Sequence, residues 1–257
     1  VRTTPMPDST ELIKAAVIAT NGNIVKMLRV DGAVYFILPA DTDNTKLNLA
    51  LSLNQNAPNN VIVSGDLGKV TGTASGISLD LTKLASKNAD GSYTIGIAVG
   101  EYRPISVKIL KSENISSMFI TSDNPAQDRI YVDSSKNNET TAQMILTGAN
   151  GTVLYNGNLT QIKARGNSTF AHYAKKSYQI KLGEKSDLIG QNQTVKTWVL
   201  LANYGDATLM HDKFFKDLAA QINMPYVAGC NWVNLWYDGE YRGVYLLSEK
   251  NSVGSTG

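Results

Sequence analysis

The sequence predicts a mainly β protein of the α+β class, in which a β-sandwich is followed by an antiparallel sheet with one main helix. The chain has 257 residues, of which 42% are hydrophobic and 18% charged, an ordinary composition for a folded protein large enough for two domains. Short runs of alternating apolar and polar residues indicate strands along most of the chain. Apolar residues recur with convincing helical spacing in one segment, which lies in the second half.

The first domain is predicted over residues 1–112. Apolar and polar positions alternate clearly at 77–81 and 93–99, as expected for half-buried strands. Asp31-Gly32 lies between two apolar runs and predicts a hairpin, because both residues tolerate the positive φ of a tight turn. A second turn is expected at 87–93. About seven short strands in about 100 residues predict an immunoglobulin-like sandwich.

The second domain is predicted over residues 113–257, because residues 111–129 are polar with one short apolar strand. Strands are expected at about 142–147, 152–155, 159–165, 176–182, 197–203, 231–237 and 241–247, with Asp238-Gly239 as the turn between the last two. A helix is expected over residues 206–223, with Asp206 as its N-cap and Met210, Phe214, Leu218 and Ile222 along one face. This order is that of a kinase N-terminal lobe, and many other α+β domains share it.

Composition and motifs exclude several kinds of protein. A net charge of +2 does not favour a chain that coats nucleic acid or membranes, and no stretch approaches the roughly 20 apolar residues of a membrane helix. Cys230 is the only cysteine and is expected to be a buried free thiol. Asp41 and Asp43 are more typical of a solvated turn than of a calcium loop. No catalytic Ser-His-Asp pattern, Walker loop or dinucleotide fingerprint is present.

A basic segment is the strongest functional signal. Residues 161–185 contain six Lys or Arg against one acid, with Gly166 in the turn between two strands. Lys181 alternates with Tyr178, Ile180 and Leu182, so it points to the opposite face of its strand. If the apolar face packs on the helix, Lys181 points into a phosphate-binding cleft. The alternative is that these cations form the solvated outer face of a sheet.

The second half also resembles a known family. The blocks IKARGNSTF, KKSYQIKL, TWVLLANYGDATLMHDKFFKDLA and LWYDGEYRGVYLLSEK are similar to consecutive blocks of the spore-coat protein H (CotH) kinase-like family, in the same order and over about residues 145–250. The resemblance implies an atypical protein kinase that uses ATP and Mg²⁺, or another divalent metal, to phosphorylate Ser or Thr of exported or coat proteins. It implies a location outside the cell, at the cell surface or in the spore coat, with the signal peptide not in this chain.

The resemblance also assigns residues to the nucleotide site. Arg165, Gly166, Asn167 and Ser168 match the RGNS loop of the family; Lys175, Lys176 and Lys181 match its lysine-bearing strand; Asn203 and Asp206 match its NYxD segment; and Glu249 matches the acid before the hinge. The resemblance implies that the loop covers the phosphates and that Lys181 or Lys176 holds them.

The chain departs from conventional kinases in two ways. The helix has no glutamate to pair with a lysine, so Asp212 or Asp217 is expected to substitute. The sequence ends at Gly257, before the second lobe that carries the catalytic and metal-binding aspartates of kinases. The chain alone is therefore expected to be inactive, with no catalytic or metal-binding residue of its own, and to be able to dimerise through the exposed face of its lobe.

Two other functions remain open from sequence. The chain could be a non-catalytic cell-surface or adhesion module of an exported bacterial protein, because a kinase-like fold can be retained for binding alone. Binding of single-stranded nucleic acid through the basic segment with Phe170, Tyr173 and Tyr178 is disfavoured by the nearly neutral charge. The acceptor protein is not identified by the sequence.

Overall fold

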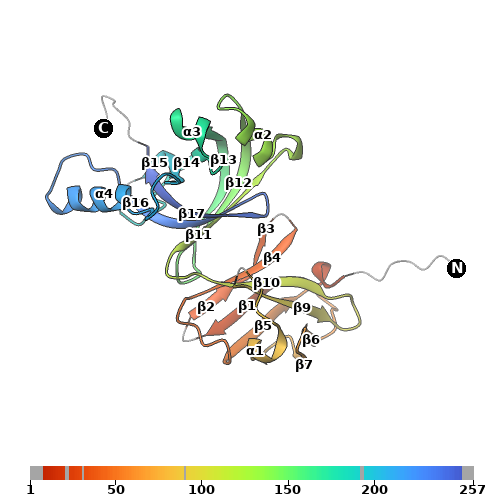
Figure 1. Cartoon of the computed structure of the whole chain (residues 1–257). Coiled ribbons are helices and arrows are strands. Elements are labelled where there is room, and N and C mark those ends of the chain that lie inside the picture. Colours follow the sequence, from red (N-terminus) through yellow and green to blue (C-terminus); the bar gives the residue numbers. More distant parts are fainter. Residues whose placement is uncertain (1–7, 21–22, 31, 90, 192–193, 251–257) are drawn as a thin grey trace. The chain divides into compact units, whose positions relative to one another are not determined.

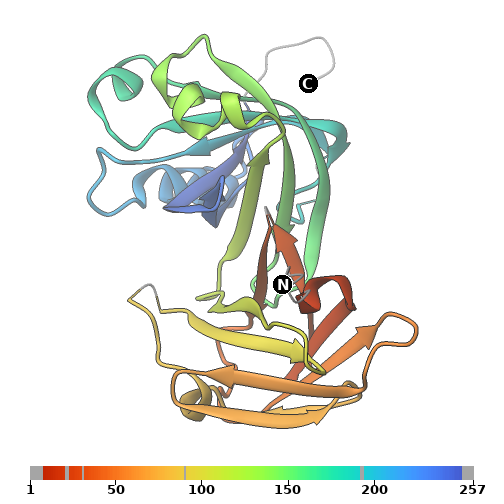
Figure 2. The ribbon, with the colours of Figure 1, turned by 90° about the vertical axis from the view of Figure 1, so that its right-hand side faces the viewer.

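The structure is a computed structural model that describes residues 8–20, 23–30, 32–89, 91–191 and 194–250. The chain divides into two compact units. The first comprises Val1–Asn114 with Gly148–Thr152, and the second comprises Ile115–Thr147 with Val153–Gly257. Figures 1 and 2 show the elements of each unit, and the units are described separately below.

The first unit contains two sheets. The four-stranded sheet has the order β2-β1-β5-β8 and contains β1 (Ile13–Thr20), β2 (Asn23–Lys26), β5 (Leu47–Leu53) and β8 (Ile77–Leu79). The six-stranded sheet has the order β3-β4-β10-β9-β6-β7 and contains β3 (Leu28–Val30), β4 (Ala33–Leu38), β6 (Asn60–Gly65), β7 (Gly68–Thr73), β9 (Tyr93–Val99) and β10 (Ile105–Lys111). Two short helical turns, η1 (Ser9–Glu11) and α1 (Leu81–Leu84), complete the unit.

The two sheets enclose one apolar core. Ile18 and Leu49 of the smaller sheet lie in the same buried cluster as Phe36, Ile97 and Val107 of the larger one. The alternation in the sequence thus places one face of each strand in a shared interior, as in a sandwich. The mainly β class is confirmed, and the immunoglobulin-like connectivity stays a prediction.

Two predicted features of this unit can be compared with the structure. β3 and β4 form an antiparallel pair and Gly32 has φ 74°, which agrees with a hairpin here, although Asp31 itself lies outside the described residues. The Asp43 carboxylate accepts hydrogen bonds from the backbone N–H and the hydroxyl of Thr45, at 2.9 and 2.6 Å. It therefore stabilises a turn.

The second unit is a closed barrel rather than an open sheet. Its strands are β11 (Ser116–Ser122), β12 (Glu139–Thr147), β13 (Val153–Arg165), β14 (Ser177–Ser186), β15 (Val195–Leu201), β16 (Cys230–Tyr237) and β17 (Glu240–Glu249), in the order β11-β12-β13-β14-β15-β17-β16. Neighbouring strands are antiparallel except β11 and β16, which pair in parallel and close the barrel. Helical segments η2 (Pro125–Gln127), α2 (Arg129–Ser134), α3 (Ser168–His172) and α4 (His211–Gln221) connect the strands.

The barrel interior explains the apolar faces of its strands. Tyr178, Ile180 and Leu182 of β14 are buried inside it together with Trp198 of β15. The condition that this face of β14 packs on the main helix is therefore not met, because the face lines the interior of the barrel. Cys230 is a buried free thiol, as predicted.

The main helix, α4, is shorter than predicted and begins at His211 instead of just after Asp206. It lies beside β16 (Figure 1), and none of its residues is fully buried. Its apolar side chains, including the predicted face, are largely solvent-exposed: Met210 57%, Phe214 56%, Phe215 62%, Leu218 39% and Ile222 62%. The helical spacing was thus correct, but the apolar stripe does not face the core.

Candidate functional site

The end of β13 forms a tight turn beside a cleft. β13 ends at Arg165, and Gly166 follows with φ 102°, a conformation that side chains disfavour. A Cβ added at Gly166 would lie 2.0 Å from Oγ1 of Thr169, in the first turn of α3. Glycine is therefore required here for both its backbone conformation and its lack of a side chain.

The cleft beside this turn has a volume of about 360 Å³ and carries both signs of charge. Its lining includes the cations Arg165 and Lys175 and the acids Asp206 and Asp212. Tyr173 and Tyr204 form aromatic walls. The two rings are 5.5 Å apart between centroids. This arrangement can hold a charged ligand that also has an apolar part.

A second cleft of about 230 Å³ adjoins the first and shares Arg165 and Leu201 with it. Val199 contributes a further apolar wall, and Lys216 and Glu249 contribute charges. Burial, reinforced by Asp187, raises the pKa of Glu249, and Lys216 opposes this shift. Two residues assigned from sequence, Arg165 and Glu249, are thus brought into one site.

Arg165 and Lys175 are the cations of the first cleft, and their surroundings differ. Within the described ranges the Arg165 side chain, which is half-buried, has no hydrogen bond or ion pair. Lys175 Nζ donates to the carbonyl of Val244 at 2.5 Å and lies 4.3 Å from the centroid of the Tyr245 ring. Burial, with a contribution from Arg242, lowers the pKa of Lys175 to about 8.

The other lysines assigned from sequence lie elsewhere. Lys176 Nζ donates to the carbonyls of Phe170 at 2.6 Å and Tyr173 at 2.7 Å, so it fixes the end of α3. Lys181 is exposed on the outer face of β14 and lines neither cleft. The position of Lys181 corresponds to the solvated outer face that was the alternative interpretation of the sequence.

The residues of the RGNS loop lie in different surroundings. Asn167 Oδ1 accepts a hydrogen bond from Lys136 Nζ at 2.6 Å, on a third cleft that also includes Arg165 and Gly166. Ser168 is exposed at the start of α3 and lines none of the three clefts. Arg165 lines all three and is their common member.

The segment before α4 is built around Asp206. Its carboxylate accepts from the N–H and hydroxyl of Thr208 at 3.0 and 2.7 Å, and from the N–H of His211 at 2.9 Å. These bonds, led by the one from His211, lower the pKa of Asp206 to about 2. Asp206 therefore caps α4 from outside the helix, and Asn203, with φ 46°, donates through Nδ2 to the Leu209 carbonyl at 3.2 Å.

The two aspartates proposed to replace a kinase glutamate differ in position. Asp217 pairs with Lys213 at 2.5 Å on the surface of α4. Asp212 instead lines the cleft with Arg165 and Lys175. Lys216, one helical turn after Asp212, was missed by the sequence interpretation, although a spacing of four residues places both side chains on one face of α4.

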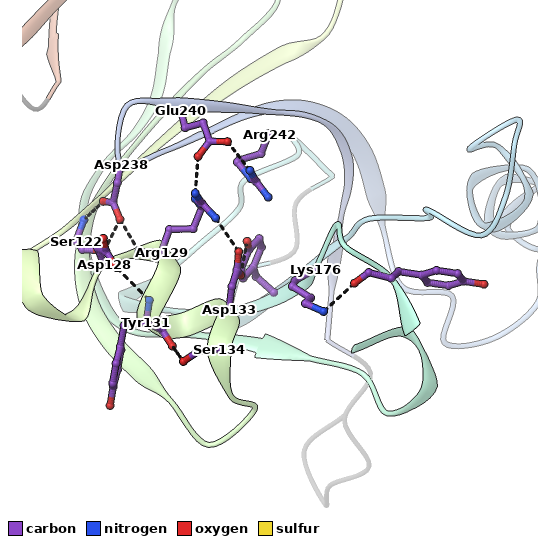
Figure 3. Close-up of polar contacts among 12 residues, drawn as sticks. Ser122, Asp128, Arg129, Tyr131, Asp133, Ser134, Lys176, Asp238, Glu240 and Arg242 are labelled. Atoms are coloured by element: carbon purple, nitrogen blue, oxygen red, sulfur yellow. Dashed lines mark hydrogen bonds and ion pairs between the residues drawn. The ribbon is translucent and has the colours of Figure 1, made fainter. Parts of the chain in front are cut away.

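A polar network at the α2 end of the barrel was also missed (Figure 3). Arg129 bridges Asp133 and Glu240, and Glu240 also pairs with Arg242. The Tyr178 hydroxyl donates to Asp133 Oδ1 at 2.8 Å, and burial of the ring raises the pKa of Tyr178. The Arg129–Asp133 pair is four residues apart, a spacing that the sequence could have revealed. The contacts of Arg129 with Glu240 and of Tyr178 with Asp133 join residues 111 and 45 positions apart, so no local sequence signal reveals them.

The match to a protein family covers the turn and both clefts. Residues 162–254 match the family model described as CotH kinase protein. The chain therefore carries a CotH-like segment. All four sequence blocks that resemble CotH proteins lie within this match, so the predicted resemblance is confirmed. None of the curated proteins compared with the chain matches it.

The CotH-like segment contributes β14 to β17 and α4, the elements that surround the first two clefts. β11, β12 and most of β13 precede the matched segment, although they belong to the same barrel. In the described part of the chain, no helix has the length and apolar character needed to cross a membrane.

Proposed function

We propose that the CotH-like segment binds the phosphates of ATP beside Gly166, as the nucleotide-side lobe of an atypical protein kinase. Its acceptor would be a Ser or Thr side chain of an exported protein, at the cell surface or in a spore coat. The observation that carries the proposal is Arg165, a half-buried guanidinium without a side-chain partner in the described residues, at the junction of the clefts.

The residues around Arg165 suit different parts of the nucleotide. Arg165 and Lys175 supply positive charge, and the positive φ of Gly166 allows a phosphate to approach the backbone closely. In the adjoining cleft, Val199 and Leu201 offer apolar walls for a flat base, and the Glu249 carboxylate can accept a hydrogen bond from an amino group of that base.

The chemistry of the lining fits phosphate better than it fits a metal ion. Bound ATP, with a divalent metal, would supply the phosphoryl group. Asp206 already accepts the N–H groups of Thr208 and His211, which leaves Asp212 as the other carboxylate of the cleft. We therefore assign binding and orientation of phosphates to this chain, and no metal ligand or catalytic residue.

A non-catalytic binding module is the second candidate function. It is favoured by the positions of Lys176, whose ammonium is held by two backbone carbonyls, and Lys181, which lines neither cleft. In this case the clefts hold a ligand other than ATP, on an exported surface protein.

Calorimetric titration with ATP, with and without Mg²⁺, tests the proposal. Loss of a charge-assisted bond to phosphate is worth about 1.5–3 kcal/mol, so Arg165→Ala should weaken binding about tenfold or more. Lys185→Ala is the matched control, because Lys185 is an exposed cation of β14 that lines none of the clefts. Equal affinities of the two variants, or no ATP binding by the unmodified chain, would favour the binding module.

A further inference from the structure

A third cleft lies on the outer face of the barrel, beside the end of β13. It has a volume of about 360 Å³ and is lined by Lys136, Lys163, Ala164, Arg165, Gly166 and Asn167. Three of these six residues are cations and none is an acid. The cleft therefore favours an anion, in contrast to the cleft of mixed charge on which the proposed nucleotide site is based.

Two of the three cations project from the same strand. Lys163 and Arg165 are two residues apart on β13, so they share a face, and the intervening Ala164 is buried on the other side. Both are half-buried. Among the described residues, neither side chain has a hydrogen bond or an ion pair, so both can receive a ligand.

The third cation comes from a different part of the barrel. Lys136 lies between α2 and β12, where Asn138 Nδ2 fixes the turn by donating to the Tyr131 carbonyl at 2.7 Å. Lys136 Nζ donates to Asn167 Oδ1 at 2.6 Å and is thereby held beside the turn that follows β13. Lys136 precedes the family match at 162–254, so the family model does not account for it.

The carboxylate that lies opposite Lys163 on the neighbouring strand forms a hydrogen bond with another residue. Glu139 of β12 lies opposite Lys163 of β13, and its Oε2 accepts a hydrogen bond from Gln161 Nε2 at 2.7 Å. Glu139 is not part of the cleft lining. The cations are thus not neutralised by an ion pair within the described residues.

We propose that this cleft is a binding site for a terminal phosphate dianion, held by Lys136, Lys163 and Arg165 with the Asn167 amide. A phosphomonoester has three terminal oxygens that accept charge-assisted hydrogen bonds, which matches cations converging from two segments. A phosphomonoester occurs on a phosphorylated Ser or Thr side chain, and the terminal phosphate of ATP, although an anhydride, presents the same three oxygens. The inference goes beyond the nucleotide proposal, because Lys136, Lys163 and Asn167 line neither of the other two clefts.

The test measures the affinities of the full chain for a phosphoserine peptide, for the same peptide with serine, and for ATP. We expect Lys136→Ala to weaken binding of a phosphorylated ligand about fivefold, since the lysine is exposed and its contribution is reduced by solvent. Lys136→Arg should restore most of the affinity. Lys185→Ala, which removes an exposed lysine of β14 away from the cleft, should have little effect.

The pattern of losses identifies the ligand. A loss confined to the phosphoserine peptide assigns the site to a phosphomonoester on a polypeptide, and a loss confined to ATP assigns it to the terminal phosphate of a nucleotide. The inference is overturned if neither phosphorylated ligand binds, or if Lys136→Ala and Lys185→Ala bind both ligands equally well. Peptide binding that depends on Lys136, without any ATP binding, would overturn the nucleotide proposal and leave this site intact.

Discussion

Among single residues, Lys175 is distinguished by its partly buried charge. Its pKa of about 8 results from burial and the nearby Arg242, whereas an arginine stays protonated over the whole accessible range. If Lys175 contacts phosphate, ATP affinity should fall as pH rises from about 7 to about 9. Lys175→Arg should remove most of this decrease, as measured by titration at several pH values. An ATP affinity that is constant over this range in the unmodified chain would exclude the contact.

The lowered pKa of Lys175 also predicts how the stability of the chain depends on pH. Between about pH 8 and the ordinary lysine pKa of 10.5, the unfolded chain binds more protons at Lys175 than the folded chain does. Lys175 therefore makes the free energy of unfolding rise with pH between these two values. At pH values below about 8 its charge is buried, which opposes folding. Urea unfolding of Lys175→Arg should lack this contribution, which provides an independent check on the titration.

Gly166 is the residue whose replacement should disturb the site most directly. Alanine there would combine a φ of 102° with a contact of 2.0 Å to Thr169 Oγ1. Gly190 offers a matched control, because its φ is 74° and an added Cβ would meet nothing within 4 Å. Gly190→Ala should cost about 1 kcal/mol in urea unfolding, and Gly166→Ala should cost more and also weaken ATP binding. Equal costs with intact ATP binding would contradict this account.

For single residues, the sequence identifies the segment that lines the site more reliably than it identifies which cations of that segment do so. Alternation within β14 correctly places Lys181 opposite Tyr178, but it cannot tell whether the outer face meets a cleft or solvent. The basic character of 161–185 is shared by Arg165, which lines the clefts, and Lys176, which fixes α3. Only three-dimensional packing separates these roles.

Among the elements, the hairpin between β16 and β17 has a second role besides reversing the chain. Asp238 and Gly239 both have positive φ, at 49° and 76°, as the predicted tight turn requires. The Asp238 carboxylate also accepts from Ser122 N at 2.7 Å, Ser122 Oγ at 3.0 Å and Arg129 N at 2.8 Å. The turn therefore holds the end of β11 and the start of α2.

Replacement of Asp238 should separate these two roles. Asp238→Gly keeps the turn conformation but leaves the N–H groups of Ser122 and Arg129 without their acceptor, at a cost of about 1–3 kcal/mol. Asp238→Asn keeps one acceptor oxygen and should lose less. Urea unfolding measures both variants, and an Asp238→Gly protein as stable as the original would show that these hydrogen bonds contribute nothing.

The sequence predicts which elements exist better than where they begin. The two strands predicted at 152–155 and 159–165 are one continuous strand, β13, because Asn156 to Asn158 pair with β12 despite their turn-like composition. For α4, the N-cap position is Met210 and not Asp206 as predicted. Asp206 accepts from the N–H of His211, five positions further on, so a capping signal does not locate the first turn.

For the whole molecule, closure of the barrel is the feature that the sequence does not predict. It depends on the parallel pairing of Ser116–Ile120 with Val233–Tyr237, over more than 100 positions, and no turn or local pattern specifies such a pair. This closure moves the apolar face of β14 to the interior and leaves the stripe on α4 exposed.

Dimerisation through the exposed face of the lobe stays a prediction, and the exposed apolar side chains of α4 give it a defined surface. Phe215 in this helix and Ile222 at its C-cap are each 62% exposed, and Tyr226 beyond them is 97% exposed. We expect the chain to self-associate, and Phe215→Ser with Ile222→Ser to shift it toward the monomer in sedimentation equilibrium. Leu67→Ser is the control, because Leu67 is also 62% exposed but lies in the first unit. A monomer at all concentrations would refute the prediction.

The central claim, that ATP phosphates bind beside Gly166, is tested most directly by following backbone amide signals of the labelled chain during titration with ATP. The account predicts saturable shifts at Arg165, Gly166 and the cleft-lining segment 201–206, with little change at Lys181. Shifts centred on Lys181, or no shifts at any ATP concentration, would contradict it.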